Sequence, residues 1–368
     1  IKLFPKAKVR SGFINRGKHI FPTGFADLLR QSVDAMADLR LTKEEKNYLS
    51  HYCPYLDPTY LDFLQGYSFD PSEVQITQEG SEISVTVEGF WYRTILWEVP
   101  LMALISELFY KANHLIRLND YAIKKLTQEK IENYNKLGVS VLEFGTRRRH
   151  SYEVHNLINE TLKTYGGQSF IGTSNVHFAM VNNKRPLGTH AHEWFMFHAA
   201  QYGFKMANSI SLEHWTQVYS GDLGIALTDT YTTDIFFNQF DKKYSKLFDG
   251  VRHDSGDPIE FAQKVISHYI KMGIDPKSKA IVFSDSLNFE KVKRIADFCT
   301  DKIKMSFGIG TNFTNDVGLP AMNMVIKLTD TKPDNTHWQG VVKLSDEINK
   351  NTGTPEMIAL AKEVLGNK

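Results

Sequence analysis

His192 stands in the string Gly188-Thr189-His190-Ala191-His192-Glu193-Trp194, between a short apolar run and the predicted start of a helix. A helix that begins there would offer free backbone N–H groups and a positive dipole, and both favour a bound phosphate. A histidine at such a position could act as a base, a metal ligand or a phosphate acceptor. The alternative is a polar residue that only begins the helix.

Polar clusters also follow the other apolar runs in the second half of the chain. Most of them contain glycine, and they lie at 144–149, 172–175, 188–193, 228–230, 252–257, 284–286 and 308–312. In (β/α) barrels the loops after the strands build the active site, commonly with a phosphate at the last pair of strands. The clusters therefore predict an enzyme whose functional residues share one face.

Two of these clusters favour anion binding. Arg147 begins a run of three arginines, of which one or two could form a planar fork to a carboxylate or phosphate while the others contact solvent. The stretch 308–312 contains Gly308, Gly310 and Thr311, which offer backbone N–H groups and a hydroxyl without obstruction by Cβ atoms. This composition favours a phosphate cradle over a plain turn.

The aspartates of the clusters allow more than one role. Asp254 could accept ribose hydroxyls or hold Mg²⁺ beside a diphosphate, and Asp285 offers the same chemistry. Asp257 precedes Pro258, and this pair predicts the cap of the next helix.

The elements that would position these side chains alternate after Gly138. Short apolar runs separated by helical stretches predict parallel strands joined by crossovers. We expect eight strands, at 139–144, 169–171, 186–187, 223–227, 250–252, 280–283, 304–307 and 322–328. They favour an irregular or incomplete (β/α) barrel over 138–329, with an open sheet as the alternative.

The first part of the chain, 1–137, predicts a second α/β domain, completed by about 330–368. It contains a helical stretch at 25–39, a hairpin over 74–87, an apolar strand at 90–99 and a helix from Pro100 through Asn113. We expect the aromatic residues Trp91, Tyr92 and Trp97 to be core.

The composition excludes several classes of protein. The 368 residues carry 43 basic and 42 acidic side chains, so no overall field draws the chain to nucleic acid or a membrane surface. No apolar run approaches the roughly 20 residues of a membrane helix. The two cysteines lack metal-ligand spacing, which favours a reducing cytoplasm.

Six of the strings, taken in order, resemble nicotinate phosphoribosyltransferase: 144–149, 172–175, 188–194, 252–258, 283–288 and 307–312. The resemblance runs from about Phe13 to Pro355. It implies a type II phosphoribosyltransferase fold and a reaction in NAD biosynthesis that joins nicotinate to phosphoribosyl diphosphate, giving nicotinate mononucleotide and diphosphate. It further implies ATP hydrolysis coupled through a phosphohistidine, Mg²⁺, and a homodimer whose active sites are shared between subunits.

Site residues follow from the resemblance position by position. The phosphorylated histidine is the one directly before Glu-Trp, which is His192 rather than His190, and Asp229 is placed to orient it. Phe144 would lie against the pyridine ring, Ser174 would face the nicotinate carboxylate, and Arg147 would face that carboxylate or a neighbouring phosphate. The remaining substrate contacts implied by the resemblance are Arg252 and Asp254 for base and ribose, Ser284, Asp285, Gly308, Gly310 and Thr311 for the 5′-phosphate, and Arg16, Lys343 and Lys350 for the diphosphate. Asp254 and Asp285 are also the candidate Mg²⁺ contacts.

One family feature does not occur in this sequence, and two alternative functions remain open. Family members begin with an Asp-x-Tyr-Lys segment, whose tyrosine extends from the partner subunit to the nicotinate base. We expect that truncation has removed this segment here. A relative that uses nicotinamide or quinolinate would share the fold, but in the nicotinamide enzyme an aspartate stands in place of Ser174. A non-catalytic barrel that binds a phosphate ligand would tolerate the loss of His192.

Overall fold

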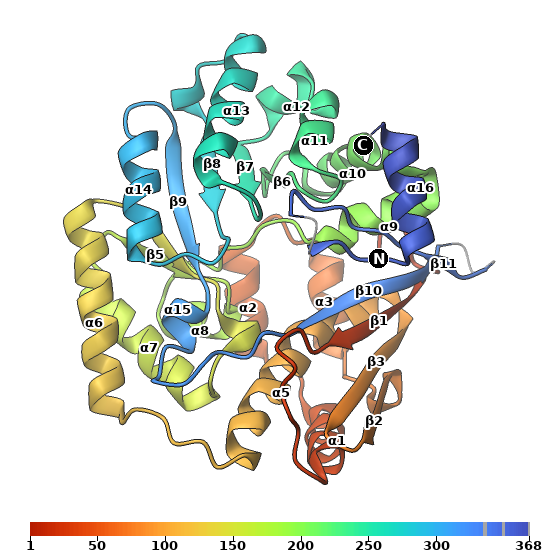
Figure 1. Cartoon of the computed structure of the whole chain (residues 1–368), viewed down its shortest axis with the longest axis vertical. Coiled ribbons are helices and arrows are strands. Elements are labelled where there is room, and N and C mark those ends of the chain that lie inside the picture. The colour runs from red at the N-terminus through yellow and green to blue at the C-terminus, as the bar shows by residue number, and fades with distance from the viewer. Residues whose placement is uncertain (334–336, 348–349, 367–368) are drawn as a thin grey trace. The chain divides into compact units, whose positions relative to one another are not determined.

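The computed structural model describes residues 1–333, 337–347 and 350–366, and they form two compact units (Figure 1). Unit 1 comprises Ile1–Val9, Gly188–Gly308 and Leu328–Lys368, and unit 2 comprises Arg10–Leu187 and Ile309–Lys327. Three strands cross from one unit to the other along the chain: β1 (Lys8–Ile14), β9 (Lys304–Ile309) and β10 (Val325–Lys332).

Unit 1 is built on parallel strands. β6 (Ile225–Leu227), β7 (Gly250–His253), β8 (Ala280–Phe283) and β9 pair in this order. Gly250 pairs with Ala280, and a Cβ atom at Gly250 would lie 2.0 Å from the Ala280 carbonyl oxygen, so only glycine fits there. The helices of this unit are α9 (His192–Tyr202), α10 (Ala207–Tyr219), α11 (Thr233–Gln239), α12 (Lys242–Leu247), α13 (Pro258–Lys271), α14 (Phe289–Cys299) and α16 (Pro355–Leu365).

The start of α13 confirms the predicted helix cap. The Asp257 carboxylate accepts hydrogen bonds from the backbone N–H groups of Ile259 and Glu260, and Pro258 is the first helical residue. Because proline has no N–H to leave unpaired, it is favoured there. This cap begins α13 directly after the loop that carries Asp254.

Unit 2 combines a parallel pair of strands with an antiparallel hairpin. β4 (Val141–Glu143) pairs with β5 (Phe170–Thr173), and β2 (Val74–Glu79) pairs with β3 (Glu82–Phe90) as predicted. The helices of this unit are α1 (Phe25–Ala35), α2 (Lys43–Tyr52), α3 (Pro58–Gly66), α4 (Trp91–Thr94), α5 (Glu98–Ala112), α6 (Asp120–Leu137), α7 (Tyr152–Tyr165), α8 (Val176–Val181) and α15 (Thr311–Thr314). The hairpin packs on α1 and α5 through a buried apolar cluster that includes Phe25, Val85 and Trp97.

Four predicted elements differ from the structure. The expected strand at 90–99 is helical, because Trp91, Thr94 and Trp97 are buried at a spacing of three, which places them on one face of a helical turn. The following helix begins at Glu98, two residues before Pro100. The run 186–187 makes only an isolated bridge to Thr173. The run 322–328 becomes β10, which pairs antiparallel with β11 (Gln339–Gly340) and is not a barrel strand.

The predicted α/β fold, with parallel strands and a second, antiparallel set, is confirmed, although the described strands do not close into a barrel. The predicted domain boundaries were placed where the pattern of strands changes along the sequence. The two compact units are instead defined by which residues pack together, so they do not test the predicted division into domains. No helix in the described part of the chain is long and apolar enough to cross a membrane.

Candidate active site

His192 is the first residue of α9, and both of its ring nitrogens face polar groups of unit 1. Its Nδ1 lies 3.0 Å from Oγ1 of Thr230. Its Nε2 lies 3.1 Å from Oδ2 of Asp254 and 3.6 Å from Oδ1 of Asp229. The side chain is 11 % exposed, so this ring is the partly accessible centre of a charged cluster.

The parallel sheet explains why these residues meet. Asp229 and Thr230 follow β6, and Asp254 follows β7, which is the neighbouring strand with Leu227 paired to Arg252. The carboxyl ends of adjacent parallel strands open at the same edge of a sheet, where ligands of α/β proteins bind. The start of α9 lies at this edge too.

Asp254 is held as an anion. Arg252 Nη2 lies 2.5 Å from its Oδ1, Ser284 Oγ donates to the same oxygen at 2.9 Å, and His192 contacts the other oxygen. Burial alone would raise the pKa of this carboxyl, but the Arg252 guanidinium and His192 bring it well below the ordinary value. Arg252 also donates to Oγ1 of Thr189 at 2.7 Å, so its guanidinium links the loop before α9 to β7.

Asp229 is buried beside the same ring and is also an anion. Ser255 Oγ donates to its Oδ2 at 2.6 Å, and Lys343 Nζ lies 3.5 Å from that oxygen. Burial raises the pKa of Asp229, but His192 and Lys343 lower it more, so the net pKa lies below the ordinary value. Its Oδ1 is buried and has no hydrogen-bond partner among the described residues.

The two histidines of the string differ in environment. Burial lowers the pKa of His192 to about 4, although Asp229 and Asp254 oppose the shift, so the ring is neutral at neutral pH. His190 is buried, packs edge-on against Trp215 at 4.1 Å between ring centroids, and has its pKa lowered to about 3 by burial. Of the two rings, His192 is the one that substrates can approach.

A second ion-pair group surrounds Asp285, which follows β8. Lys350 Nζ lies 3.0 Å from Asp285 Oδ1 and 3.0 Å from Glu347 Oε1. Burial opposes the charge of Lys350, but the two carboxylates raise its pKa above the ordinary value. Lys350 thus joins Arg252 and Lys343 as a cation paired with a carboxylate that follows one of the parallel strands of unit 1.

Two groups of the described residues could contact a Mg²⁺ ion, and they differ in how well they suit it. His192, Asp229 and Asp254 could offer three ligand atoms within 4.8 Å of one another. Arg252 and Lys343 already balance the two carboxylates, however, and an added dication would leave excess buried charge. Asp285 is partly exposed and pairs with a long flexible lysine, so it fits a hydrated Mg²⁺ held through a diphosphate better than Asp254 does.

Most of the other predicted contacts lie in unit 2, whereas Gly308 is in unit 1. Phe144 follows β4 and donates its N–H to the Ile309 carbonyl at 2.8 Å, and the exposed Ser174 donates its N–H to the Glu143 carbonyl at 2.8 Å. Arg147 lies 2.7 Å from Glu98 Oε1, so its guanidinium already contacts a carboxylate. Arg16 is exposed in the turn after β1.

The glycines of unit 2 differ in the space around them. A Cβ atom at Gly310 would come no closer than 3.9 Å to another atom, the Phe144 carbonyl oxygen, so space remains for a ligand beside Thr311. A Cβ at Gly145 would lie 2.1 Å from Oγ1 of Thr314, so packing alone requires glycine there.

Several residues of these clusters were not predicted from the sequence. Thr230, Thr189 and Ser255 stand inside strings that were singled out, so their position next to candidate residues was a usable signal. Glu143 and Ser345 carried no such signal. Glu143 is fully buried, 2.8 Å from the likewise buried His155, and accepts hydrogen bonds from Thr173 Oγ1 and the Gly145 N–H.

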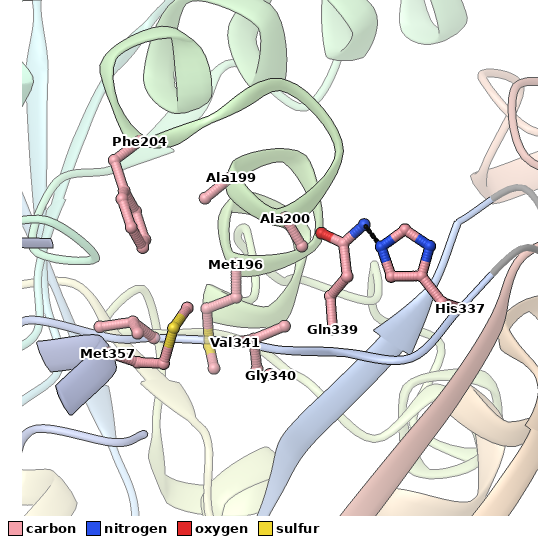
Figure 2. A pocket seen from close by; sticks show the side chains of 10 residues that line it. Met196, Ala199, Ala200, Phe204, His337, Gln339, Gly340, Val341 and Met357 are labelled. Atoms are coloured by element: carbon pink, nitrogen blue, oxygen red, sulfur yellow. Dashed lines mark hydrogen bonds between the residues drawn. The ribbon is translucent and has the colours of Figure 1, made fainter. Parts of the chain in front are cut away.

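A separate cavity of about 440 Å³ lies along α9 (Figure 2). Met196, Ala199 and Ala200 of α9 line it together with Met357 of α16, and Gln339 contacts His337 at its rim. The lining is mainly apolar and does not include His192. It is therefore not part of the charged cluster.

The charged cluster lies at the carboxyl ends of parallel strands, which is the edge at which α/β proteins bind their ligands. Residues 139–368 match the nicotinate phosphoribosyltransferase (NAPRTase) family, and residues 1–106 match the NAPRTase N-terminal domain. The chain therefore belongs to the nicotinate phosphoribosyltransferase family and is an enzyme.

Individual relatives agree along almost the whole chain. The chain is 61 % identical over 365 residues to the nicotinate phosphoribosyltransferase of Chromohalobacter salexigens, covering 99 % of this chain and 94 % of that protein. The crystal structure of the Porphyromonas gingivalis nicotinate phosphoribosyltransferase matches with a TM-score of 0.96 at 45 % identity, over 99 % of this chain and 95 % of that one. The Vibrio cholerae enzyme matches with a TM-score of 0.93 at 32 % identity, over 100 % and 90 %.

Proposed function

We propose that the chain forms nicotinate mononucleotide and diphosphate from nicotinate and phosphoribosyl diphosphate, and that it couples this reaction to ATP hydrolysis through phosphorylation of His192. The observation that carries the proposal is the neutral, partly exposed His192 ring at the start of α9, 3.0 Å from Thr230 and beside two carboxylates. Family membership supports the transferase reaction, and the geometry supports the histidine step.

The histidine step needs one ring tautomer. When Nε2 carries the proton, which faces the carboxylates of Asp254 and Asp229, Nδ1 keeps its lone pair beside Thr230 Oγ1 and can attack the γ-phosphorus of ATP. A bond forms between nitrogen and phosphorus, the bond to the bridging oxygen breaks, and ADP leaves with the electron pair. The cations of Arg252 and Lys343 offset the repulsion between the incoming phosphate and the carboxylates.

The transfer step follows from charge. Cleavage of the bond between ribose C1 and diphosphate develops positive charge on the sugar and negative charge on the leaving group, which Arg252, Lys343 and Lys350 can stabilise. Mg²⁺ bound through Asp285 and the diphosphate would supply further positive charge. Nicotinate needs no general base, because its ring nitrogen already carries a free electron pair. A phosphate on His192 therefore acts on substrate binding and not on the reacting bond.

The remaining assignments belong to the same proposal. Nicotinate would contact Phe144, Arg147 and Ser174, and ribose would contact Asp254. The 5′-phosphate would bind at Gly308, Gly310 and Thr311 with Ser284, and Arg16 would contact the diphosphate. We also propose a cytoplasmic homodimer with shared active sites, which light scattering of the purified protein tests for its oligomeric state.

The deciding experiment measures nicotinate mononucleotide formation and ATP hydrolysis by the wild type and by His192→Asn. The wild type should be stimulated by ATP and carry acid-labile phosphate on the peptide that contains His192. The variant should lose ATP hydrolysis and keep weak, ATP-independent synthesis. His177→Asn, which changes an exposed histidine of α8, is the control and should behave as the wild type does.

Three results would contradict the proposal. Nicotinate-stimulated ATP hydrolysis by His192→Asn would show that another residue accepts the phosphate. Faster turnover of nicotinamide than of nicotinate would favour the nicotinamide-using relative, and no turnover at all would favour a non-catalytic phosphate-binding protein.

A further inference from the structure

The two oxygens of the Asp229 carboxylate have different surroundings. Oδ2 accepts a hydrogen bond from Ser255 Oγ at 2.6 Å, and it lies 3.4 Å from Ser345 Oγ and 3.5 Å from Lys343 Nζ. Oδ1 has no hydrogen-bond partner among the described residues and lies 3.6 Å from Nε2 of His192. The contacts on Oδ2 therefore set the direction in which Oδ1 points.

Ser255 and Ser345 come from distant parts of the chain and bond to each other. Ser255 directly follows Asp254 in the loop after β7, and Ser345 lies in the C-terminal segment 341–345. Ser345 Oγ donates to Ser255 Oγ at 3.0 Å, and both side chains are buried. The two hydroxyls and the Asp229 carboxylate form one hydrogen-bonded group.

The segment 341–345 pairs with the loop after β6 in a register that places the Ser345 hydroxyl beside Asp229. The Leu344 N–H donates to the Thr230 carbonyl at 2.8 Å, so the segment runs beside the loop after β6. Val342 and Leu344 are buried in an apolar cluster with α9. Successive side chains of an extended segment point to opposite sides, so Lys343 and Ser345, two residues apart, share a side and both reach Asp229.

We propose that Ser255 and Ser345 are positioning residues, which hold the Asp229 carboxylate toward His192 so that the histidine can accept a phosphate. The inference rests on the proposed phosphorylation of His192. A hydrogen bond to a buried carboxylate is a strong one, because the acceptor is charged and water is excluded. Ser255 makes the shorter contact and carries the larger share of the positioning.

The test compares the rate of phosphohistidine formation from ATP and of nicotinate mononucleotide formation in Ser255→Ala, Ser345→Ala and the wild type. We expect Ser255→Ala to lower both rates about tenfold, as the loss of one hydrogen bond to a charged group allows, and Ser345→Ala to lower them less. Both serines line a polar cavity of about 620 Å³, where water can replace a lost hydroxyl, so the variants should fold. Ser245→Ala is the matched control, because Ser245 is buried in α12 and donates to the Phe240 carbonyl.

A double-mutant cycle with Asp229→Asn separates positioning from general stability. If Ser255 acts through Asp229, adding Ser255→Ala to Asp229→Asn should lower the rate much less than it does in the wild type. If Ser255→Ala lowers the rate by the same factor in the wild type and in Asp229→Asn, Ser255 does not act through Asp229 and the inference is wrong. It is also wrong if Ser255→Ala and Ser245→Ala lower the rate equally. If the wild type forms no phosphohistidine, the proposed function is wrong, and the same cycle on nicotinate mononucleotide formation still decides the role of Ser255.

Discussion

Each unit contains a buried carboxylate beside a histidine, but the two pairs differ in what surrounds them. In unit 2, Glu143 and His155 are both fully buried, and the carboxylate also accepts hydrogen bonds from Thr173 and the Gly145 N–H. In unit 1, His192 is partly exposed at the start of a helix, and one oxygen of Asp229 lacks a hydrogen-bond partner among the described residues.

The difference separates a structural pair from a reactive one. Glu143 ties the loop that begins at Phe144 to the end of β5, from which Ser174 follows, and its contacts leave little capacity for a ligand. Burial would raise the pKa of Glu143, but His155 lowers it more, so the carboxylate stays charged. The pair in unit 1 keeps an accessible ring, so one ring nitrogen can face the carboxylate while the other remains available to a phosphate.

The largest effect is expected at the loop that Glu143 holds. Ser174→Asp would place a negative charge near the nicotinate carboxylate, and two such charges ~4 Å apart in a partly screened site repel by roughly 4 kcal/mol. Nicotinate turnover should fall by about a thousandfold, with a small gain for nicotinamide. Steady-state kinetics with both substrates measures this, and Ser174→Asn is the neutral control. Near-normal efficiency with nicotinate would show that Ser174 does not face the carboxylate.

Exchange of the two carboxylates for amides tests the comparison directly. Glu143→Gln should lower the free energy of unfolding by about 3 kcal/mol, because it breaks a buried ion pair and leaves its partners unsatisfied. The activity of each folded molecule should fall only slightly. Asp229→Asn should also cost stability, because it leaves the buried Lys343 without its carboxylate, but unlike Glu143→Gln it should strongly lower the ATP-stimulated synthesis of each folded molecule. Denaturant unfolding and activity per folded molecule distinguish them, and equal profiles for the two variants would refute the distinction.

Substitutions of Gly310 and Gly145 in unit 2 should have a smaller effect on activity or stability. Gly310→Val should raise the KM for phosphoribosyl diphosphate about tenfold and leave that for nicotinate nearly unchanged, because the added side chain would enter free space beside Thr311. Gly145→Ala should instead destabilise the fold, since its Cβ would collide with Thr314. Equal changes in both KM values for Gly310→Val would argue against a phosphate site.

Stability should also depend on pH, through histidines that lie outside the two pairs. Burial lowers the pKa of His150 and of His198 to about 4 and that of His190 to about 3. An unfolded histidine binds its proton near pH 6.5, so below that value the unfolded state binds more protons than the folded state. Stability should therefore fall between about pH 6.5 and 4, by roughly 1.4 kcal/mol per pH unit for each histidine that stays unprotonated in the folded state. Urea unfolding across this range checks the sign, and stability that rises on acidification would contradict it.

Much of the fold and site could be predicted from local patterns. The hairpin over 74–87 follows from alternating apolar residues around a turn, and the cap at Asp257 follows from a carboxylate before proline. The polar strings after the strands marked His192, Asp229 and Asp254, because parallel strands bring their carboxyl ends to one edge. The expected strand at 90–99 was wrong because its apolar residues also suit a helix, and only packing of Trp91 and Trp97 decided between the two.

Contacts between distant residues could not be predicted in this way. Whether Asp254 or Asp229 lies nearer to His192 depends on side-chain directions in the packed sheet, and Asp254 is nearer by 0.5 Å, at 3.1 Å against 3.6 Å. Ser345 has no local signal, since it reaches Asp229 only because the segment 341–345 pairs with the loop after β6. The residue types and their order along the chain thus establish the family and the candidate chemistry. Only tertiary packing decides which carboxylate oxygen faces the histidine, because that direction depends on hydrogen bonds between segments more than a hundred residues apart.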